Sequence, residues 1–263
     1  MKRVIVGISA ASAAAFVTAA PAQAAPADPI KALKGQFVAG KGVKFTDRTT
    51  LTGDGTNVLI LRRTGSFQFG RSGIVASDIS AKAGATSDEP AAAAVARLTP
   101  ERTIRIGTTS YTSGGVLAEK LPKGKVWYKD PQGMAAGGSG WFGQIVNVAE
   151  PATLQTLLRS AKKSHTTYSG TITFGKLAKI SPWFRASLRI WSKDTAVAKY
   201  SITMNRDGLP QRLTTSYPAT GLFDSNGWEG KTISVETRFT DWGGKVSIKA
   251  PPASKVTAKL DDD

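Results

Sequence analysis

Alternation of apolar and polar residues between Thr195 and Pro252 constrains this chain more than any other feature. Apolar residues occupy every second position from Ala198 to Met204, and Lys, Ser and Thr stand between them. A period of two places successive side chains on opposite faces of a strand, one buried and one solvated. The tetrapeptide from Asn205 to Gly208 has the composition of a tight turn and leads into a second strand that reaches Tyr217. This region therefore predicts a half-buried antiparallel sheet.

A second hairpin is predicted immediately downstream. Apolar and polar residues alternate again from Ile233 to Phe239, and Asp241-Trp242-Gly243-Gly244 has the composition of a turn. The segment from Val246 to Ile248 would then return the chain as a fourth strand before Pro251-Pro252 ends the pairing.

Strand and helix patterns also occur upstream. Strands are predicted between residues 58 and 79 and between residues 104 and 128, and Ile172 and Phe174 indicate one more. Helices are predicted to start at Asp28-Pro29, Pro151 and Ser181-Pro182, because Pro is favoured in the first helical turn. The last of these helices is apolar on most of its sides, and its apolar positions are the following: Trp183, Phe184, Leu188, Ile190 and Trp191.

A sheet with this many strands is expected to curl. Each strand twists relative to its neighbour, and an open sheet of about ten strands curves to protect its apolar face. We therefore expect the α+β class, with a strongly curved antiparallel sheet, or half-barrel, of about ten strands and two or three helices on its concave face.

The N-terminal 24 residues have the pattern of a cleaved secretory signal peptide. Lys2 and Arg3 precede an apolar run, and Ala22-Gln23-Ala24 resembles a cleavage site. A membrane anchor is the alternative, but the run is short and contains Ser and Thr. Residues 25–259 are then expected to form a single domain and residues 260–263 an acidic tail. The Ala- and Gly-rich stretch from Ala81 to Ala96 is interpreted as a surface excursion within that domain.

Composition narrows the classes of partner. The chain has no cysteine, which excludes disulfides, thiolate metal sites and lipid attachment to a cysteine. The net charge is +16, and it stays strongly positive without Lys2 and Arg3, but the basic residues are scattered. Scattered charge without interleaved aromatic residues argues against nucleic acid. It fits attraction to an anionic membrane surface or the cell wall, and it fits simple solubility equally well. We expect a monomer that is secreted, extracellular or cell-wall associated, and not lipid-anchored.

Catalytic motifs are missing from the sequence. His165 is the only histidine, and no Gly-x-Ser-x-Gly elbow presents a serine to it. Ser160 and Lys163 match Ser-x-x-Lys, but the partner motifs Ser-Asp-Asn and Lys-Thr-Gly do not occur. The Gly-rich run from Gly137 to Gly140 is not followed by the Gly-Lys-Ser/Thr of a phosphate-binding loop. We expect a protein that is not an enzyme, without metal or cofactor.

Several segments resemble a known family. They are Thr166-Thr167-Tyr168-Ser169-Gly170-Thr171, Asp207-Gly208-Leu209-Pro210-Gln211-Arg212, Phe239-Thr240-Asp241-Trp242-Gly243 and Val246-Ser247-Ile248-Lys249-Ala250-Pro251. Together they resemble actinobacterial lipid-carrying lipoproteins of the LppX and LprG type, whose half-barrel is similar to that of the bacterial lipoprotein carriers LolA and LolB. The resemblance is strongest from about Pro151 to Pro252, and the chain departs from the family by lacking the lipobox cysteine.

The resemblance implies a non-catalytic carrier that shelters lipid or another acyl-chain ligand between the sheet and the helices. Each buried CH₂ contributes roughly 0.8 kcal/mol, so a diffuse apolar cavity suffices for binding. Such a lining is mostly apolar and has the same composition as an ordinary core. The candidate cavity residues are the following: Leu33, Phe37, Phe67, Phe69, Tyr168, Ile172, Phe174, Trp183, Phe184, Leu188, Trp191, Tyr200, Ile202, Met204 and Leu213.

Two other functions fit the same sequence. The first is a binding module for cell-wall glycan or an anionic polymer, in which exposed tryptophans stack on sugars and basic residues hold anionic groups. Its candidate tryptophans are Trp127, Trp141, Trp228 and Trp242. The second is an envelope sensor or regulatory protein built on the same half-barrel. An internal apolar cavity favours the carrier, whereas exposed, roughly coplanar rings favour the glycan module.

Overall fold

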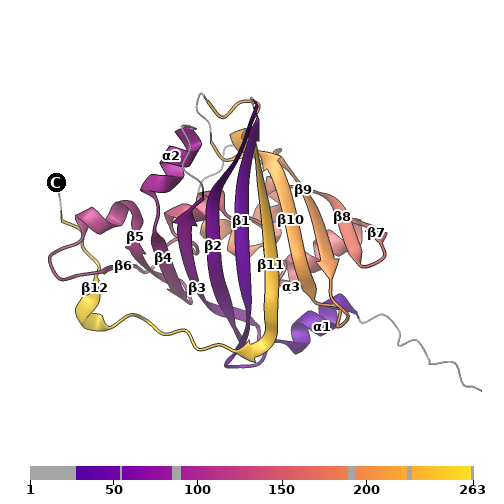
Figure 1. The fold of residues 1–263 in the computed structure, drawn as a ribbon. Helices are drawn as coiled ribbons and strands as arrows, with labels where there is room; N and C mark the ends of the chain where they lie inside the picture. Colours follow the sequence, from indigo (N-terminus) through magenta and orange to yellow (C-terminus); the bar gives the residue numbers. More distant parts are fainter. Residues whose placement is uncertain (1–27, 54, 85–89, 189–192, 224–226, 262–263) are drawn as a thin grey trace, which may run out of the picture.

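One open sheet organises the molecule. The computed structural model describes residues 28–53, 55–84, 90–188, 193–223 and 227–261. Within them, twelve strands form a single sheet in the order β12-β6-β5-β4-β3-β2-β1-β11-β10-β9-β8-β7 (Figure 1). The strands are β1 (Lys41–Gly53), β2 (Thr56–Gly70), β3 (Gly73–Ala83), β4 (Glu101–Ile106), β5 (Thr109–Gly114), β6 (Trp127–Asp130), β7 (Lys162–Ser164), β8 (Thr167–Thr173), β9 (Val197–Met204), β10 (Pro210–Pro218), β11 (Thr232–Lys245) and β12 (Val256–Thr257).

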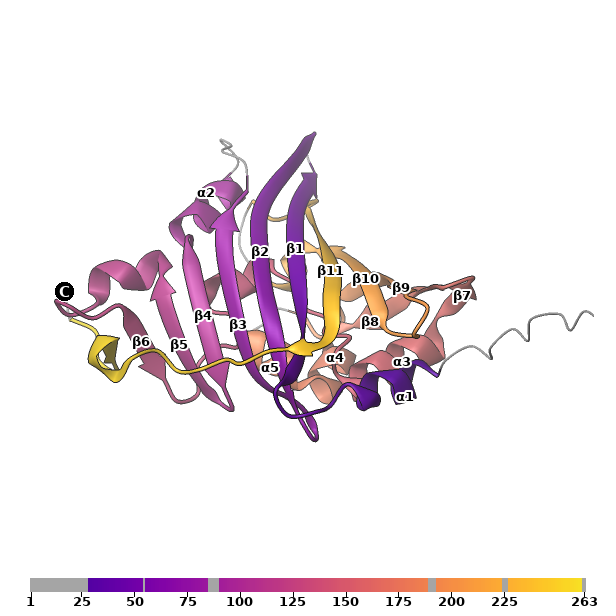
Figure 2. The same cartoon turned by 60° about the horizontal axis from the view of Figure 1, so that its bottom comes forward.

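The helices gather on one side of this sheet. They are α1 (Pro29–Gly35), α2 (Pro90–Arg97), α3 (Pro151–Ser160), α4 (Phe174–Ile180) and α5 (Pro182–Ser187), with short 3₁₀ turns at Gly115–Lys120, Gly138–Phe142, Ala219–Gly221 and Ala253–Lys255. Figure 2 shows α3, α4 and α5 behind the strands, while the opposite side of the sheet carries no helix. We call the covered side the inner face and the uncovered side the outer face. The expected α+β fold with an open antiparallel sheet and helices on one face is confirmed.

Side-chain alternation sets the two faces. In β1, the inner positions Phe45, Asp47 and Thr49 are buried, whereas Thr46 and Arg48 between them are exposed. Every neighbouring pair of strands is antiparallel except β6 and β12, which are parallel. The antiparallel register keeps inner residues opposite inner residues, so the core forms a continuous layer between the sheet and the helices.

The first predicted hairpin is confirmed and the second is wrong. Asn205 caps the turn between β9 and β10 by accepting hydrogen bonds at its side-chain oxygen from the N–H groups of Asp207 (3.0 Å) and Leu209 (2.8 Å). Residues 241–243 instead form a bulge within β11, because strand pairing with β1 continues to Lys245. The region from Thr195 to Pro252 therefore contains three strands of the sheet and not four.

The helices differ in part from expectation. The predicted starts at Pro29, Pro151 and Pro182 are confirmed, and Asp28 caps α1 by accepting from the N–H of Ile30 at 2.8 Å. Helix α2 lies within the stretch interpreted as a surface excursion, since its Ala residues have high helix propensity. Phe174 begins α4 and does not continue a strand, because Thr173 caps that helix. Helix α5 ends at Ser187, and Ile190 and Trp191 lie outside the described residues.

The C-terminal segment after β11 crosses the ends of several strands. It runs along one end of the sheet and pairs as β12 with β6 (Figure 2). Ile248 is held on the way, because its N–H donates to Oε1 of Gln68 at 2.6 Å. Among the described helices, none combines the length and the apolar character that crossing a bilayer requires.

Candidate functional site

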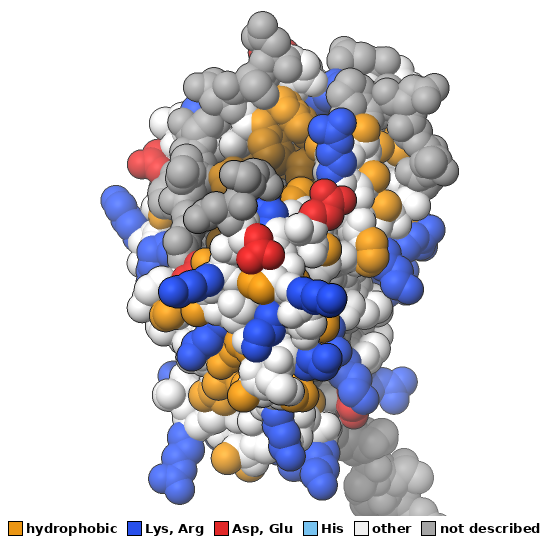
Figure 3. Space-filling model, turned by 90° about the vertical axis from the view of Figure 1, so that its left-hand side faces the viewer, with side chains coloured by type: hydrophobic (Ala, Val, Ile, Leu, Met, Phe, Trp, Pro, Cys, Tyr) orange, Lys and Arg blue, Asp and Glu red, His pale blue; other side chains and the backbone are white. Residues whose placement is uncertain are grey.

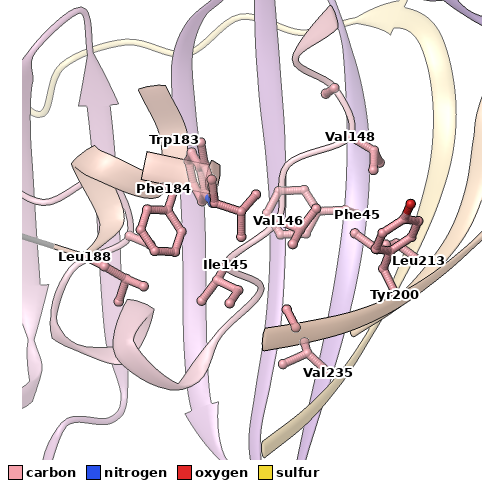
Figure 4. Close-up of a cluster of buried hydrophobic side chains, with 14 of the residues drawn as sticks. Phe45, Ile145, Val146, Val148, Trp183, Phe184, Leu188, Tyr200, Leu213 and Val235 are labelled. Carbon is pink, nitrogen blue, oxygen red and sulfur yellow. The ribbon is translucent and has the colours of Figure 1, made fainter. Parts of the chain in front are cut away.

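An irregular segment fills the space between the sheet and the helices. Residues 142–149, which we call the inner segment, form no strand pairing and are buried at every position. Figure 4 shows Ile145 and Val146 of this segment between Phe184 of α5 and Phe45 of the sheet, with Val148 farther along on the side of Tyr200 and Leu213. The inner segment therefore occupies the space between the sheet and the helices, which we call the inner trough. This is the space in which the family resemblance implied room for a ligand.

Side chains, and not a strand ladder, hold the inner segment against the sheet. The hydroxyl of Thr49 donates to the carbonyl of Phe142 at 2.7 Å, and the indole of Trp183 donates to the carbonyl of Gln144 at 3.1 Å. The amide side chain of Gln144 bonds Thr237 (3.1 Å) and Thr215 (2.9 Å). Each such bond contributes about 0.5–1.5 kcal/mol, so the attachment consists of a few separable contacts.

A buried ion pair lies beneath this segment. The side chains of Asp47 and Arg63 are each 1% exposed, and Nε of Arg63 donates to Oδ2 of Asp47 at 2.9 Å, with a second contact from Nη2. The guanidinium packs directly on Gly143, where an added methyl group would lie 2.0 Å from Cζ of Arg63. Glycine at this position therefore lets the backbone of the inner segment pass over the charge.

Two polar atoms of this pair and one polar atom beside it lack a hydrogen-bond partner in the structure. They are Oδ1 of Asp47, Nη1 of Arg63 and Nδ2 of Asn147. All three residues line one small inner cavity of about 10 Å³, whose other walls are Phe45, Phe67, Gln144, Val146, Trp183, Thr237 and Phe239. That volume accommodates at most about one water molecule. In this form of the protein the middle of the trough is filled.

Trp183 separates the inner cavity from the surface. Trp183 lines the inner cavity and also a surface cleft of about 90 Å³, together with Ile74, Val75, Ala76, Ser77, Arg105, Gly107, Glu150 and Pro182. Two apolar side chains stand exposed at this end of the sheet, Val75 at 41% and Ile106 at 37%. The ring of Trp183 packs edge-on against Phe67 with centroids 5.1 Å apart. One aromatic ring thus stands between an apolar surface and an apolar interior.

Glu150 fixes the helix that carries Trp183. Its carboxylate accepts from the N–H of Trp183 at 2.7 Å, from the hydroxyl of Ser181 at 2.6 Å and from the hydroxyl of Thr153 at 2.8 Å. Burial raises the pKa of Glu150, and the hydrogen bond from Ser181 is the largest opposing influence. The indole is therefore positioned by a polar cluster at the start of α5.

The opposite end of the trough is open and apolar. Figure 3 shows a hollow lined by hydrophobic side chains in its upper part, the end of the molecule at which α2 lies in Figure 1. Where β10 leads toward β11, Phe223 stacks on Trp228 with centroids 4.3 Å apart and on Phe142 at 5.1 Å. The first residue of the inner segment thus belongs to this aromatic cluster.

A second buried carboxylate anchors the chain ahead of the inner segment. Glu101 on β4 accepts from the N–H of Gly138 and the N–H of Ser139, both at 3.0 Å, and from the hydroxyl of Ser139 at 2.7 Å. Burial raises the pKa of Glu101. The glycine-rich run from Gly137 to Gly140 is thereby fixed on its carboxylate.

The predicted cavity residues are in or beside the core, but few line the inner cavity. Leu33, Phe67, Phe69, Ile172, Phe174, Trp183, Phe184, Leu188, Tyr200, Ile202, Met204 and Leu213 are buried, Phe37 and Tyr168 are half-buried, and Trp191 lies outside the described residues. Of these, Phe67 and Trp183 line the inner cavity. Tyr168 and Met204 instead line a separate surface pocket near His165.

Sequence reasoning missed most of the inner lining. Asp47 and Arg63 sit at inner positions of the alternating pattern, where a charged residue is itself an unusual signal. The uninterrupted buried run from Phe142 to Ala149 was also overlooked, although Ile145, Val146 and Val148 are apolar. The tryptophans of the glycan alternative are not exposed: Trp127, Trp141, Trp228 and Trp242 are all half-buried, and Trp242 stacks on Phe69.

A cluster of metal ligands and the single histidine would each be a further chemical centre. No group of three or more His, Asp or Glu side chains within them could hold a metal ion. His165 is exposed, and the hydroxyl of Ser164, its neighbour in the chain, lies 3.4 Å from Nδ1.

Comparison with known proteins gives structural similarities only. No family model matches the sequence, and no curated protein matches it. Among solved structures, LprF from Mycobacterium bovis is similar at 12% identity and a TM-score of 0.41, over 85% of this chain and 93% of that one. A LolA superfamily protein from Nitrosomonas europaea, NE2245, is similar at 8% identity and a TM-score of 0.30, over 85% and 93%. Similarities at this level assign no ligand to this chain.

Proposed function

We propose that this protein binds and carries lipid or another acyl-chain ligand, without catalysis, between the inner face of the sheet and the helices. The expected export of the chain, its release without a lipid anchor and its monomeric state are parts of the same proposal. An exported carrier of this kind would keep hydrocarbon out of water between two hydrophobic environments.

The position of Trp183 is the observation that carries this proposal. This residue lines both the surface cleft beside Val75 and the inner cavity beside Phe67. Rotation of this one side chain joins the apolar surface to the apolar interior. Because the opposite end of the trough is also hollow and apolar (Figure 3), a continuous path along the inner face needs only the inner segment to shift.

The apolar side chains of the inner segment fill the space that an acyl chain would occupy. Burying one large aliphatic side chain is worth about 1.5–3 kcal/mol, so Ile145, Val146 and Val148 together represent roughly 5–9 kcal/mol of apolar burial. A chain of about ten methylenes supplies on the order of 8 kcal/mol gross. The apolar burial of an acyl chain and that of the inner segment are therefore comparable in free energy. An acyl chain can replace the inner segment when the displaced side chains are buried elsewhere, as in the hollow at the end of the molecule where α2 lies.

Lipid capture and a paired substitution test the proposal. Protein purified without detergent is examined by native mass spectrometry, and uptake of a fluorescent long-chain fatty acid is followed in solution. Trp183→Ala removes the ring between cleft and cavity and is expected to speed uptake several-fold. Phe184→Ala is the matched control, because Phe184 is a neighbour on α5, is fully buried and lines neither space.

Both substitutions are expected to cost about 3–5 kcal/mol of folding stability, since each truncates a large buried ring. A difference in the rate of lipid uptake between the two variants therefore reports the role of Trp183 between cleft and cavity, and not a loss of folding stability. Absence of bound lipid together with absence of uptake would overturn the carrier function. Equal changes in uptake for the two variants would show that Trp183 is ordinary core.

A further inference from the structure

The outer face of the sheet is hollowed into two adjoining troughs. A trough of about 870 Å³ crosses β9, β10, β11 and β1, and a second of about 420 Å³ continues across β1, β2, β3 and β4. Thr46 borders both. In Figure 1 this side of the sheet faces the viewer and no helix covers it. It lies on the other side of the strands from the inner segment.

Short hydroxyl side chains line the larger trough. Thr214 on β10 lies opposite Ser201 on β9 and Glu236 on β11, and Ser234 lies opposite Thr50. The hydroxyl residues of its lining that are not buried on the inner face are Thr46, Thr50, Ser201, Thr214, Ser216 and Ser234. Strand register therefore builds a broad surface of small hydrogen-bonding groups below the longer charged side chains.

Three basic residues extend from this trough in direct cross-strand register. Arg48 on β1 lies opposite Arg62 on β2, which lies opposite Lys82 on β3, and all three are exposed. Like charges directly opposite one another destabilise a sheet. Within the described part of the chain, no carboxylate forms an ion pair with any of the three. Glu236 on β11 lies directly opposite Arg48, but its carboxylate is bonded to Arg212 and Arg238. We call these residues the basic row. Because one carboxylate is shared among these basic side chains, the row keeps a net positive charge and matches an anionic partner.

The shape of the trough selects among anionic partners. A flat bilayer cannot reach the floor of a concave surface, and the lining offers no exposed apolar side chain to insert. Stacking on sugar or base rings is absent too, because Tyr200 is 4% exposed and its hydroxyl donates to the carbonyl of Leu157 at 2.7 Å. A flexible linear polymer that bears both anionic groups and hydroxyls fits the remaining chemistry.

We propose that the outer face binds a linear polyol-phosphate polymer, with phosphates on the basic row and polyol hydroxyls along the Ser/Thr floor. Guanidinium groups match the two free oxygens of a phosphodiester, and short hydroxyl side chains pair with polyol hydroxyls. Because this surface and the inner cavity lie on opposite faces of the sheet, the protein can hold an acyl ligand and remain bound to an envelope polymer.

Binding of poly(glycerol phosphate) of defined length tests this surface. The variant Arg48→Gln/Arg62→Gln/Lys82→Gln removes the basic row. It is expected to lower affinity roughly 100-fold at low salt, at about fivefold per basic side chain, and to reduce the slope of log affinity against log salt by about 2. The control variant Arg159→Gln/Lys176→Gln/Lys179→Gln removes three exposed charges from α3 and α4. It is expected to change affinity by less than threefold.

Parallel probes separate the partners. Polyglutamate tests charge without hydroxyls, oligothymidine tests a phosphodiester with bases, and phosphatidylglycerol vesicles test a bilayer. Preference for poly(glycerol phosphate), lost only in the basic-row variant, supports the proposal. Equal weakening in both triple variants, equal binding of polyglutamate or oligothymidine, or preference for vesicles overturns it. Thermal unfolding of the basic-row variant should occur at the same or a higher temperature, which excludes misfolding as the cause.

Discussion

The buried pair of Asp47 and Arg63 allows the inner face of the sheet to be tested by substitution. Arg63→Met leaves a carboxylate that is 1% exposed without its partner, and Asp47→Leu leaves an equally buried guanidinium. Removing one member of a buried pair costs about 3–5 kcal/mol, because the remaining charge is uncompensated. Replacing both members with apolar residues of similar volume is often neutral or stabilising. The free energy of unfolding of the double variant is therefore expected to lie within about 1 kcal/mol of the wild-type value.

Urea denaturation followed by tryptophan fluorescence measures these differences. Each single variant should shift the midpoint without changing the slope, which keeps the comparison on the free energy of unfolding. The exposed pair Arg102–Asp78 is the matched control: its side chains are 50% and 25% exposed, and Arg102→Met should cost no more than about 1 kcal/mol.

Additive losses would refute the reasoning. If the double variant lost the sum of the two single losses, each side chain would contribute through packing and not through its partner. The pairing argument also bears on the ligand site. Removing both charges eliminates two polar groups that an acyl chain must lie against, so the double variant should bind a long-chain fatty acid at least as tightly as the wild type.

Two further predictions concern neighbouring residues. Burial raises the pKa of Glu150 above its ordinary value of 4.5, so the folded state holds this proton more tightly than the unfolded state. Its contribution to stability is then greatest below pH 4.5 and is lost as pH rises through the raised pKa. Glu150→Gln should flatten that decline in a pH series of urea midpoints, and an unchanged decline would contradict the assignment. Gly143→Ala should cost at least about 1–3 kcal/mol by overpacking against Arg63. Gly35→Ala, with nothing within 4 Å of the new methyl group, should be nearly neutral, and equal losses would contradict the role of the close contact.

Local secondary structure could be predicted from the sequence better than the residues that fill the space between the sheet and the helices. The β9–β10 hairpin follows from alternation and from Asn205 at the turn, both of which are local. The stretch Asp241–Gly244 has the composition of a turn, yet it forms a bulge in β11 because pairing with β1 continues beyond it. Turn composition records which residues tolerate unusual backbone angles, and bulges use the same residues.

The inner segment was beyond the reach of pattern reasoning for another reason. Its apolar residues follow neither a period of two nor one of 3.6, because no regular backbone hydrogen bonding orders them. Which side chains line the inner cavity depends on where this segment crosses the sheet, and that is decided by bonds from Thr49, Thr215 and Thr237 on distant strands. Core membership could be predicted for Phe67 and Trp183, but their place at the cavity could not.

The open sheet also has consequences for how copies of the protein behave at high concentration. An unclosed sheet exposes two terminal strands, and unpaired backbone groups there are templates for aggregation. Here one terminal strand, β7, has three residues and exposes two lysines, and the other, β12, has two residues. Both terminal strands are short and β7 is also charged, so they leave little for another molecule to pair with. A chain without disulfides can thus keep a twelve-stranded sheet unclosed without joining its neighbours into fibrils.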